Sequence, residues 1–191
     1  MTKARDLASG GFGLVLVKPS SVVNGTDNGK GTVSFSAAST VSLNGVFNSI
    51  YTNYKIIIDF TGSSATSDVV MRMRANGSDT AGTSYRYQRL RNTSTTVTGQ
   101  AETSGVGTDE WFLGENVTGA DAGSAFFDIT ILTPNVAKYT TFYSMSSNYS
   151  TASIGMYTAG VLRDSTQYDG FSFYAISGTI TGSVSVYGYN K

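Results

Sequence analysis

The 191 residues of the chain include no histidine and no cysteine. The absence of histidine removes the commonest general base of enzymes, the middle member of a Ser-His-Asp triad and the side chain that most often binds transition metals. The absence of cysteine removes disulfides and thiol chemistry. Carboxylate pairs, tyrosine and lysine remain available for catalysis, but an enzyme is the least favoured class, and we expect no metal ion and no other cofactor.

Charge and long apolar runs are also scarce. Thirteen basic and thirteen acidic residues make up 14% of the chain and leave no net charge, so the chain lacks the basic excess that duplex nucleic-acid binders use to neutralise phosphates. The longest apolar runs, Leu14 to Val17 and Ile56 to Ile58, are far shorter than the roughly 20 residues that cross a bilayer. No apolar stretch of signal-peptide length follows Lys3 and Arg5. We therefore expect no nucleic-acid partner and no insertion into a membrane.

The residues that are abundant favour β-structure. Glycine is frequent, at 22 residues, while proline occurs twice, and apolar residues alternate with serine, threonine and charged residues over many short segments. Turn sequences such as Asn76-Gly77 and Asp169-Gly170 separate these segments. About ten short strands at this spacing predict an all-β protein built as an antiparallel β-sandwich, jelly-roll-like in its connections. The alternation assigns core-facing side chains to Val33, Phe35, Tyr54, Ile56, Ile58, Phe60, Val69, Met71, Met73, Phe127, Ile129, Ile131, Ile180, Val184 and Val186.

The first 30 residues read as an arm and linker ahead of a sandwich domain at residues 31–191. A short segment with helical character over residues 2–8 precedes the hinge Gly10-Gly11-Phe12-Gly13, and an apolar strand follows over residues 12–18. A strand at a terminus can be the first strand of its own sandwich, or it can pair with another chain by strand addition. Both alternatives remain open from the sequence.

Two blocks of the sequence resemble known proteins. The opening Lys3-Ala4-Arg5-Asp6-Leu7-Ala8 and the later Val46-Phe47 with Tyr51-Thr52-Asn53-Tyr54-Lys55-Ile56 resemble small tail-fibre and other virion structural proteins of bacteriophages, notably marine ones. The resemblance covers roughly the first 60 residues. It implies a role in assembly or attachment, a location in the virion at the tail or the capsid surface, other virion proteins as partners, and a homo-oligomer with a trimer favoured. The residues that we expect to attach the chain to the virion or to a sister subunit are Lys3, Arg5, Leu7, Phe12, Leu14 and Leu16.

A group of arginines and aromatic residues is the candidate contact site of the body. Arg72 and Arg74 share one strand face, and we expect the next strand to bring Arg86 to the same side. Guanidinium groups beside phenol rings can bind acidic glycans on a host surface, and they are also enriched at subunit interfaces. A solvated basic face without any partner is the third alternative. The aromatic residues of this candidate glycan or interface site are Tyr85, Tyr87 and Trp111, although core packing is the favoured role of Trp111.

Acidic residues give weaker signals. Asp109, Glu110 and Glu115 surround Trp111, but neighbouring residues of a strand face opposite sides, so this group is not predicted to form a catalytic carboxylate pair. Asp27-Asn28-Gly29 lacks the further carboxylates of a strong calcium loop and is predicted to be a plain turn.

Three function classes follow. The favoured one is a tail-fibre or receptor-binding component of a virion. The alternatives are a capsid decoration (knob) protein and a free carbohydrate-binding module.

Overall fold

The protein is described by a computed structural model that covers residues 13–93, 96–101, 108–117, 125–149 and 153–189. These residues form strands and connecting turns, with no helix among them and hence none that could cross a membrane. The strands are β1 (Leu14–Leu16), β2 (Ser21–Val23), β3 (Thr26–Asp27), β4 (Thr32–Ala38), β5 (Val41–Asn44), β6 (Asn53–Ser63), β7 (Ser67–Ala75), β8 (Ser78–Asp79), β9 (Tyr85–Thr93), β10 (Thr96–Ala101), β11 (Trp111–Val117), β12 (Ala125–Leu132), β13 (Thr140–Tyr149), β14 (Ser153–Leu162), β15 (Gly170–Ala175) and β16 (Ile180–Tyr189).

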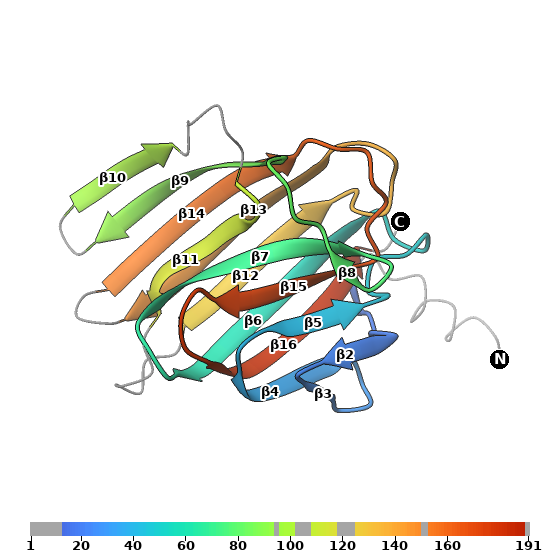
Figure 1. The fold of residues 1–191 in the computed structure, drawn as a ribbon, viewed down its shortest axis with the longest axis horizontal. Coiled ribbons are helices and arrows are strands. Elements are labelled where there is room, and N and C mark those ends of the chain that lie inside the picture. The colour runs from blue at the N-terminus through green and yellow to red at the C-terminus, as the bar shows by residue number, and fades with distance from the viewer. Residues whose placement is uncertain (1–12, 94–95, 102–107, 118–124, 150–152, 190–191) are drawn as a thin grey trace.

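The strands make two antiparallel sheets that pack face to face. The larger has ten strands in the order β10-β9-β14-β13-β12-β6-β16-β4-β3, with β1 also paired to β16. The smaller has the order β11-β7-β15-β5-β2, with β8 paired to β7. Figure 1 shows the smaller sheet lying across the larger one, and the chain passes repeatedly between the two layers. The predicted all-β fold, an antiparallel sandwich, is confirmed.

The core lies between the layers, where the predicted alternation places it. All fifteen residues assigned to the core from the sequence are buried. Aromatic rings fill the centre of the core. The Phe60 ring packs edge to face against Phe127 with centroids 5.2 Å apart, and Phe35 packs in the same way against Phe173 at 5.4 Å. Such pairs contribute about 0.5–1.5 kcal/mol each beyond the area that they bury.

A tight hairpin turn joins β7 to β8. Asn76 and Gly77 both adopt positive φ, at 54° and 77°, which is the backbone of a type I′ turn. Because this turn follows the right-handed twist of the strands, the Asn-Gly pair predicted to be a turn sets the register in which Arg74 faces Asp79. This register matters for the arginine contacts described below.

The described part of the N-terminal segment lies against the sandwich. Leu14–Leu16 pair with β16 of the same chain, and the Val17 amide donates to the Val186 carbonyl at 2.8 Å. Strands β2 and β3 pair with β5 and β4, so they extend one edge of each sheet. Of the two alternatives for the strand near residues 12–18, the structure contains the first, a strand of the chain's own sandwich. The helical segment expected over residues 2–8 lies outside the described residues.

Candidate functional site

The arginines expected to form one cluster are divided between the two sheets. Arg72 and Arg74 lie on β7 of the smaller sheet, whereas Arg86 lies on β9 of the larger one. The expectation that the next strand would carry Arg86 beside them is therefore wrong. The hairpin after Ala75 forms only the two-residue strand β8, and the chain then crosses to the other layer before β9 begins.

Arg72 is held by acidic and aromatic neighbours. Its guanidinium forms ion pairs with the carboxylates of Asp109 and Glu110, the latter at 3.1 Å, and stacks over the Tyr174 ring at 5.4 Å. Asp109 and Glu110 thus meet on one guanidinium, contrary to the expectation that they face opposite sides. The Tyr174 hydroxyl donates to Glu110, and burial together with this hydrogen bond raises the pKa of Tyr174. The Arg72 guanidinium is consequently not free to bind an acidic glycan.

Arg74 is a buried structural residue. Its side chain pairs with Asp79, donates to the Asn44 amide oxygen at 2.9 Å and donates to the Gly77 carbonyl. It also reaches the Ser42 hydroxyl at 3.3 Å. Arg74 therefore connects β5, β7 and β8 from within the smaller sheet. Arg86, by contrast, donates to the carbonyls of Thr83 and Tyr85 on its own side of the molecule.

Two further arginines of β9 pair with a carboxylate of β11, which belongs to the other sheet. Arg89 and Arg91 approach the Glu115 carboxylate at 3.3 and 2.5 Å, and Arg89 stacks over the Phe112 ring at 4.1 Å. A hollow of about 490 Å³ lies here between β7, β9 and β11. Of its charged lining residues, Arg89 pairs with Glu115, while Asp109 and Glu110 pair with Arg72.

The aromatic residues predicted for the candidate site are core residues. Trp111 is fully buried and stacks on Phe142 with centroids 4.2 Å apart, which agrees with its favoured role in packing. Tyr85 is also fully buried, accepts a hydrogen bond from the Met73 amide at 2.9 Å and packs edge to face on Trp111. Tyr87 is buried as well, with its ring 6.1 Å from Phe112. These rings are therefore not a platform for an external ligand.

The residues expected to attach the chain to a virion are described only in part. Lys3, Arg5, Leu7 and Phe12 lie outside the described residues. Leu14 pairs with Tyr189 and is exposed, while Leu16 pairs with Tyr187 and is half-buried. The attachment role of this segment stays a prediction.

The Asp27 loop is a turn, as predicted. The Asp27 carboxylate accepts hydrogen bonds from the amides of Gly29 and Gly31, both at 3.0 Å, and lies 3.6 Å from the Lys18 ammonium group. Asn28 accepts from the Lys30 amide at 2.8 Å. Within the described ranges, the acidic residues form no group of three that could hold a metal ion.

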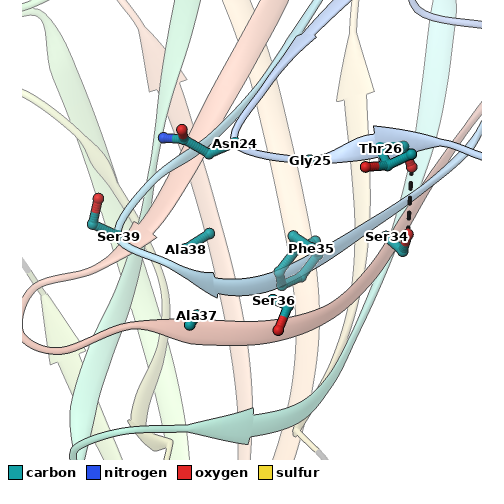
Figure 2. A pocket seen from close by; sticks show the side chains of 9 residues that line it. All are labelled: Asn24, Gly25, Thr26, Ser34, Phe35, Ser36, Ala37, Ala38 and Ser39. Carbon is teal, nitrogen blue, oxygen red and sulfur yellow. Dashed lines mark hydrogen bonds between the residues drawn. The ribbon is translucent and has the colours of Figure 1, made fainter.

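A hollow of about 490 Å³ lies beside this loop, between the turn that joins β2 to β3 and the edge of β4 (Figure 2). Its rim carries the side chains of Asn24, Thr26 and Ser34, and the Ser34 hydroxyl donates to the Thr26 carbonyl at 3.4 Å. A bulge in β4, where Ala37 adopts a φ of 48°, widens this edge. The one aromatic ring lining the hollow, Phe35, is buried among core rings, so it offers a ligand no stacking surface.

The outer face of the ten-stranded sheet is the surface that the sequence did not reveal. Leu90, Tyr157 and Met145 stand opposite one another on β9, β14 and β13, and all three are exposed. Three more exposed apolar side chains, Phe126, Tyr143 and Val97, lie on the same face in adjacent register rows. We call these six residues the apolar face. Exposed apolar groups gathered in one place are typical of an interaction surface.

A groove of about 340 Å³ runs across the apolar face. It is lined by residues of four neighbouring strands, β9, β14, β13 and β12, and none of its lining side chains is charged. Gly155 lies in this groove between Asn92 and Ser147, its register partners on either side. A Cβ atom placed on Gly155 would meet no heavy atom within 4 Å, so the missing side chain leaves the hollow open.

Charged residues border the groove on one side. Asp128 on β12 is the register partner of Met145 on β13. The Lys55 ammonium group binds the Asp128 carboxylate at 2.7 Å. This hydrogen bond raises the pKa of Lys55. Asp59, opposite Phe126, is exposed. The apolar face is therefore bounded by polar groups and does not extend over the whole sheet.

The sequence held one signal for this face. Several strands carry apolar residues at both alternating positions, for example Phe142 beside Tyr143 and Phe127 beside Phe126. The two members of each pair point to opposite faces of the strand, and Phe126 and Tyr143 are the members that lie exposed on the outer face. Neighbouring apolar residues are not a sufficient signal, since Trp111 and Phe112 on β11 are both buried.

No family model matches the chain, and no curated protein matches it. Among solved structures, the chain is similar to the SPRY domain of human HERC1, with 10% sequence identity and a TM-score of 0.32 over 86% of this chain and 99% of that one. A likeness at this TM-score supports no inference about function.

Proposed function

We propose that the chain is a structural protein of a bacteriophage particle, a tail-fibre or receptor-binding component that acts by assembly and by contact with the host surface. The proposal rests on the resemblance of the two N-terminal sequence blocks and on one structural observation. That observation is the apolar face, which is exposed while Arg72, Arg74, Arg89 and Arg91 are paired with carboxylates of the same chain.

The chemistry of the surface suits such a role. Contacts through uncharged, partly aromatic surfaces draw their free energy from apolar burial, at about 25 cal/mol per Å², and depend little on salt. Contacts of this kind would keep their strength when a particle meets its host in a medium of high ionic strength. Copies of the chain are proposed to assemble as a homo-oligomer, with a trimer favoured, which would repeat the apolar face several times on one particle.

The proposal is tested in two steps. Mass spectrometry of purified phage particles that encode the chain should detect it as a virion component. Recombinant chain added to host cells should then compete with the phage for adsorption. Absence of the chain from particles would refute the proposal.

A matched pair of variants assigns the contact to the apolar face. Met145, on that face, and Ile176, which follows β15 of the other sheet, are each 60% exposed. Met145→Ser should weaken the competition several-fold, whereas Ile176→Ser should leave it unchanged. If instead the chain is present in particles but both variants compete as the wild type does, the apolar face is not the host contact, and the capsid decoration protein becomes the favoured alternative.

A further inference from the structure

We infer that the groove around Gly155 is a binding site for an uncharged saccharide. This inference rests on the proposed contact with a host surface and names the chemical class that the contact recognises. The groove combines two exposed rings, Tyr157 and Phe126, with small polar groups and has no charged side chain in its lining. Its volume of about 340 Å³ lies within the range of about 300–1,000 Å³ of small-molecule sites.

The side chains in the groove match the two sides of a sugar ring. Tyr157 and Phe126 are 47% and 41% exposed and offer aromatic surface to the C–H face of a pyranose. Asn92 and Ser147 are exposed beside them and supply an amide and a hydroxyl that can donate and accept hydrogen bonds. A few polar groups placed among apolar walls give orientation as well as affinity.

The absence of positive charge in the groove disfavours nucleic acids and acidic sugars as ligands. Single-stranded nucleic acids also stack on aromatic side chains, but the proteins that bind them add a positively charged groove. Here the lining side chains are uncharged, the nearby Asp128 carboxylate is neutralised by Lys55, and the exposed Asp59 carboxylate would repel phosphate, sulfate or a carboxylated sugar. The groove therefore favours a neutral saccharide over an acidic one.

The charges beside the apolar face disfavour a second copy of the chain as the occupant. A stable protein interface buries about 800 Å² on each partner. Asp59 and the Lys55–Asp128 ion pair lie on the β6 side of the apolar face, so a second copy that extended to that side would have to cover these charges. A compact ligand can lie between Tyr157 and Phe126 without removing these charges from water.

Gly155 provides a variant that blocks the site and keeps the fold. Gly155 is a strand residue without a positive φ, and a side chain there would enter open space. Gly155→Ile should fill the groove, and it should not destabilise the sheet, because β-branched residues are favoured in strands and glycine is not. Gly62→Ile is the matched control, since Gly62 is also a strand residue without a positive φ, and its Cβ would meet only Thr181 at 3.9 Å.

The experiment measures binding of the full chain to a panel of neutral oligosaccharides, with heparin as an acidic polysaccharide, by titration calorimetry at low and high salt. We expect at least one neutral oligosaccharide to bind. Gly155→Ile and Tyr157→Ala should each weaken it about tenfold or more, which corresponds to the loss of one buried ring contact. Gly62→Ile should bind as the wild type does, and salt should have little effect.

Several results would overturn the inference. These are binding of no neutral oligosaccharide, neutral binding that Gly155→Ile leaves intact, or salt-sensitive binding of heparin alone. Sedimentation of the same samples could give a fourth contradicting result. Self-association that Gly155→Ile abolishes would identify the groove as a contact between copies of the chain. None of these results bears on whether the chain is found in phage particles, so the inference and the proposed function can fail separately.

Discussion

At the scale of single residues, burial decides what each aromatic and charged side chain can do. Trp111 and Tyr85 are enclosed in the core, and Arg72 is paired with acidic neighbours. Tyr157 and Met145, which no sequence motif marks, are exposed on one face. The residue types that most often indicate binding are thus structural here, and less conspicuous ones carry the candidate site.

Replacement of Trp111 should affect stability and not binding. Trp111→Ala removes the ring that stacks on Phe142 and touches Tyr85, and truncation of a fully buried Trp costs about 3–5 kcal/mol. Urea unfolding followed by circular dichroism measures this loss. At temperatures where the variant is folded, its saccharide binding should equal that of the wild type. A variant of full stability that fails to bind would place Trp111 in a site.

At the scale of elements, strand assignments follow the sequence more closely than strand neighbours do. The alternation of β6, β7 and β12 identified their core faces, because apolar side chains every second residue can be buried on one side only. Strand order depends on pairing between distant segments, and the sequence pattern does not encode it directly. For this reason Arg72 and Arg86, which lie 14 positions apart, were expected on adjacent strands and lie in different sheets.

The same limit applies to the candidate site. Its groove is formed where β9, β14, β13 and β12 come together, and these strands span residues 85–162. A glycine such as Gly155 is uninformative in the sequence until its register partners Asn92 and Ser147 are known. The Asn76-Gly77 turn, by contrast, was predictable because its signal is local.

Arg74 connects β5, β7 and β8, so its replacement should lower the stability of the protein. Arg74→Met leaves the partly buried Asp79 carboxylate without its partner and removes the bond to Asn44. The expected cost is about 1–3 kcal/mol, below that of a fully buried pair because Asp79 is partly exposed. Arg86→Met is the control, since Arg86 donates to the backbone carbonyls of Thr83 and Tyr85 close to it in the chain. Thermal unfolding should show a lower midpoint for Arg74→Met than for Arg86→Met, and equal midpoints would contradict this role.

At the scale of the whole molecule, buried tyrosines should limit stability at high pH. Burial is the leading cause that raises the pKa of Tyr54, Tyr85, Tyr168 and Tyr174 above the usual tyrosine value of 10.0. Above pH 10 the unfolded chain loses these protons while the folded chain keeps them, so the free energy of unfolding falls as pH rises. The contribution of these tyrosines is complete below pH 10.

Urea unfolding at intervals from pH 7 to 11.5 measures this dependence. The unfolding midpoint should stay level up to about pH 9, where no histidine titrates, and should then fall steeply. Tyr85→Phe should lower stability at pH 7 by about 1–3 kcal/mol, because the Met73 amide loses its acceptor. It should also reduce the decline above pH 10. An equal decline in the variant would show that Tyr85 is not one of the groups responsible.

We propose that the chain belongs to a phage particle and presents its apolar face to the host. An electron cryo-microscopy reconstruction of the particle that resolves this chain would test both parts of the proposal. We expect the chain at the tail, with Met145 and Tyr157 of every copy facing outward and open to solvent. A particle without the chain, or one in which the apolar face is covered by the shell, would contradict it.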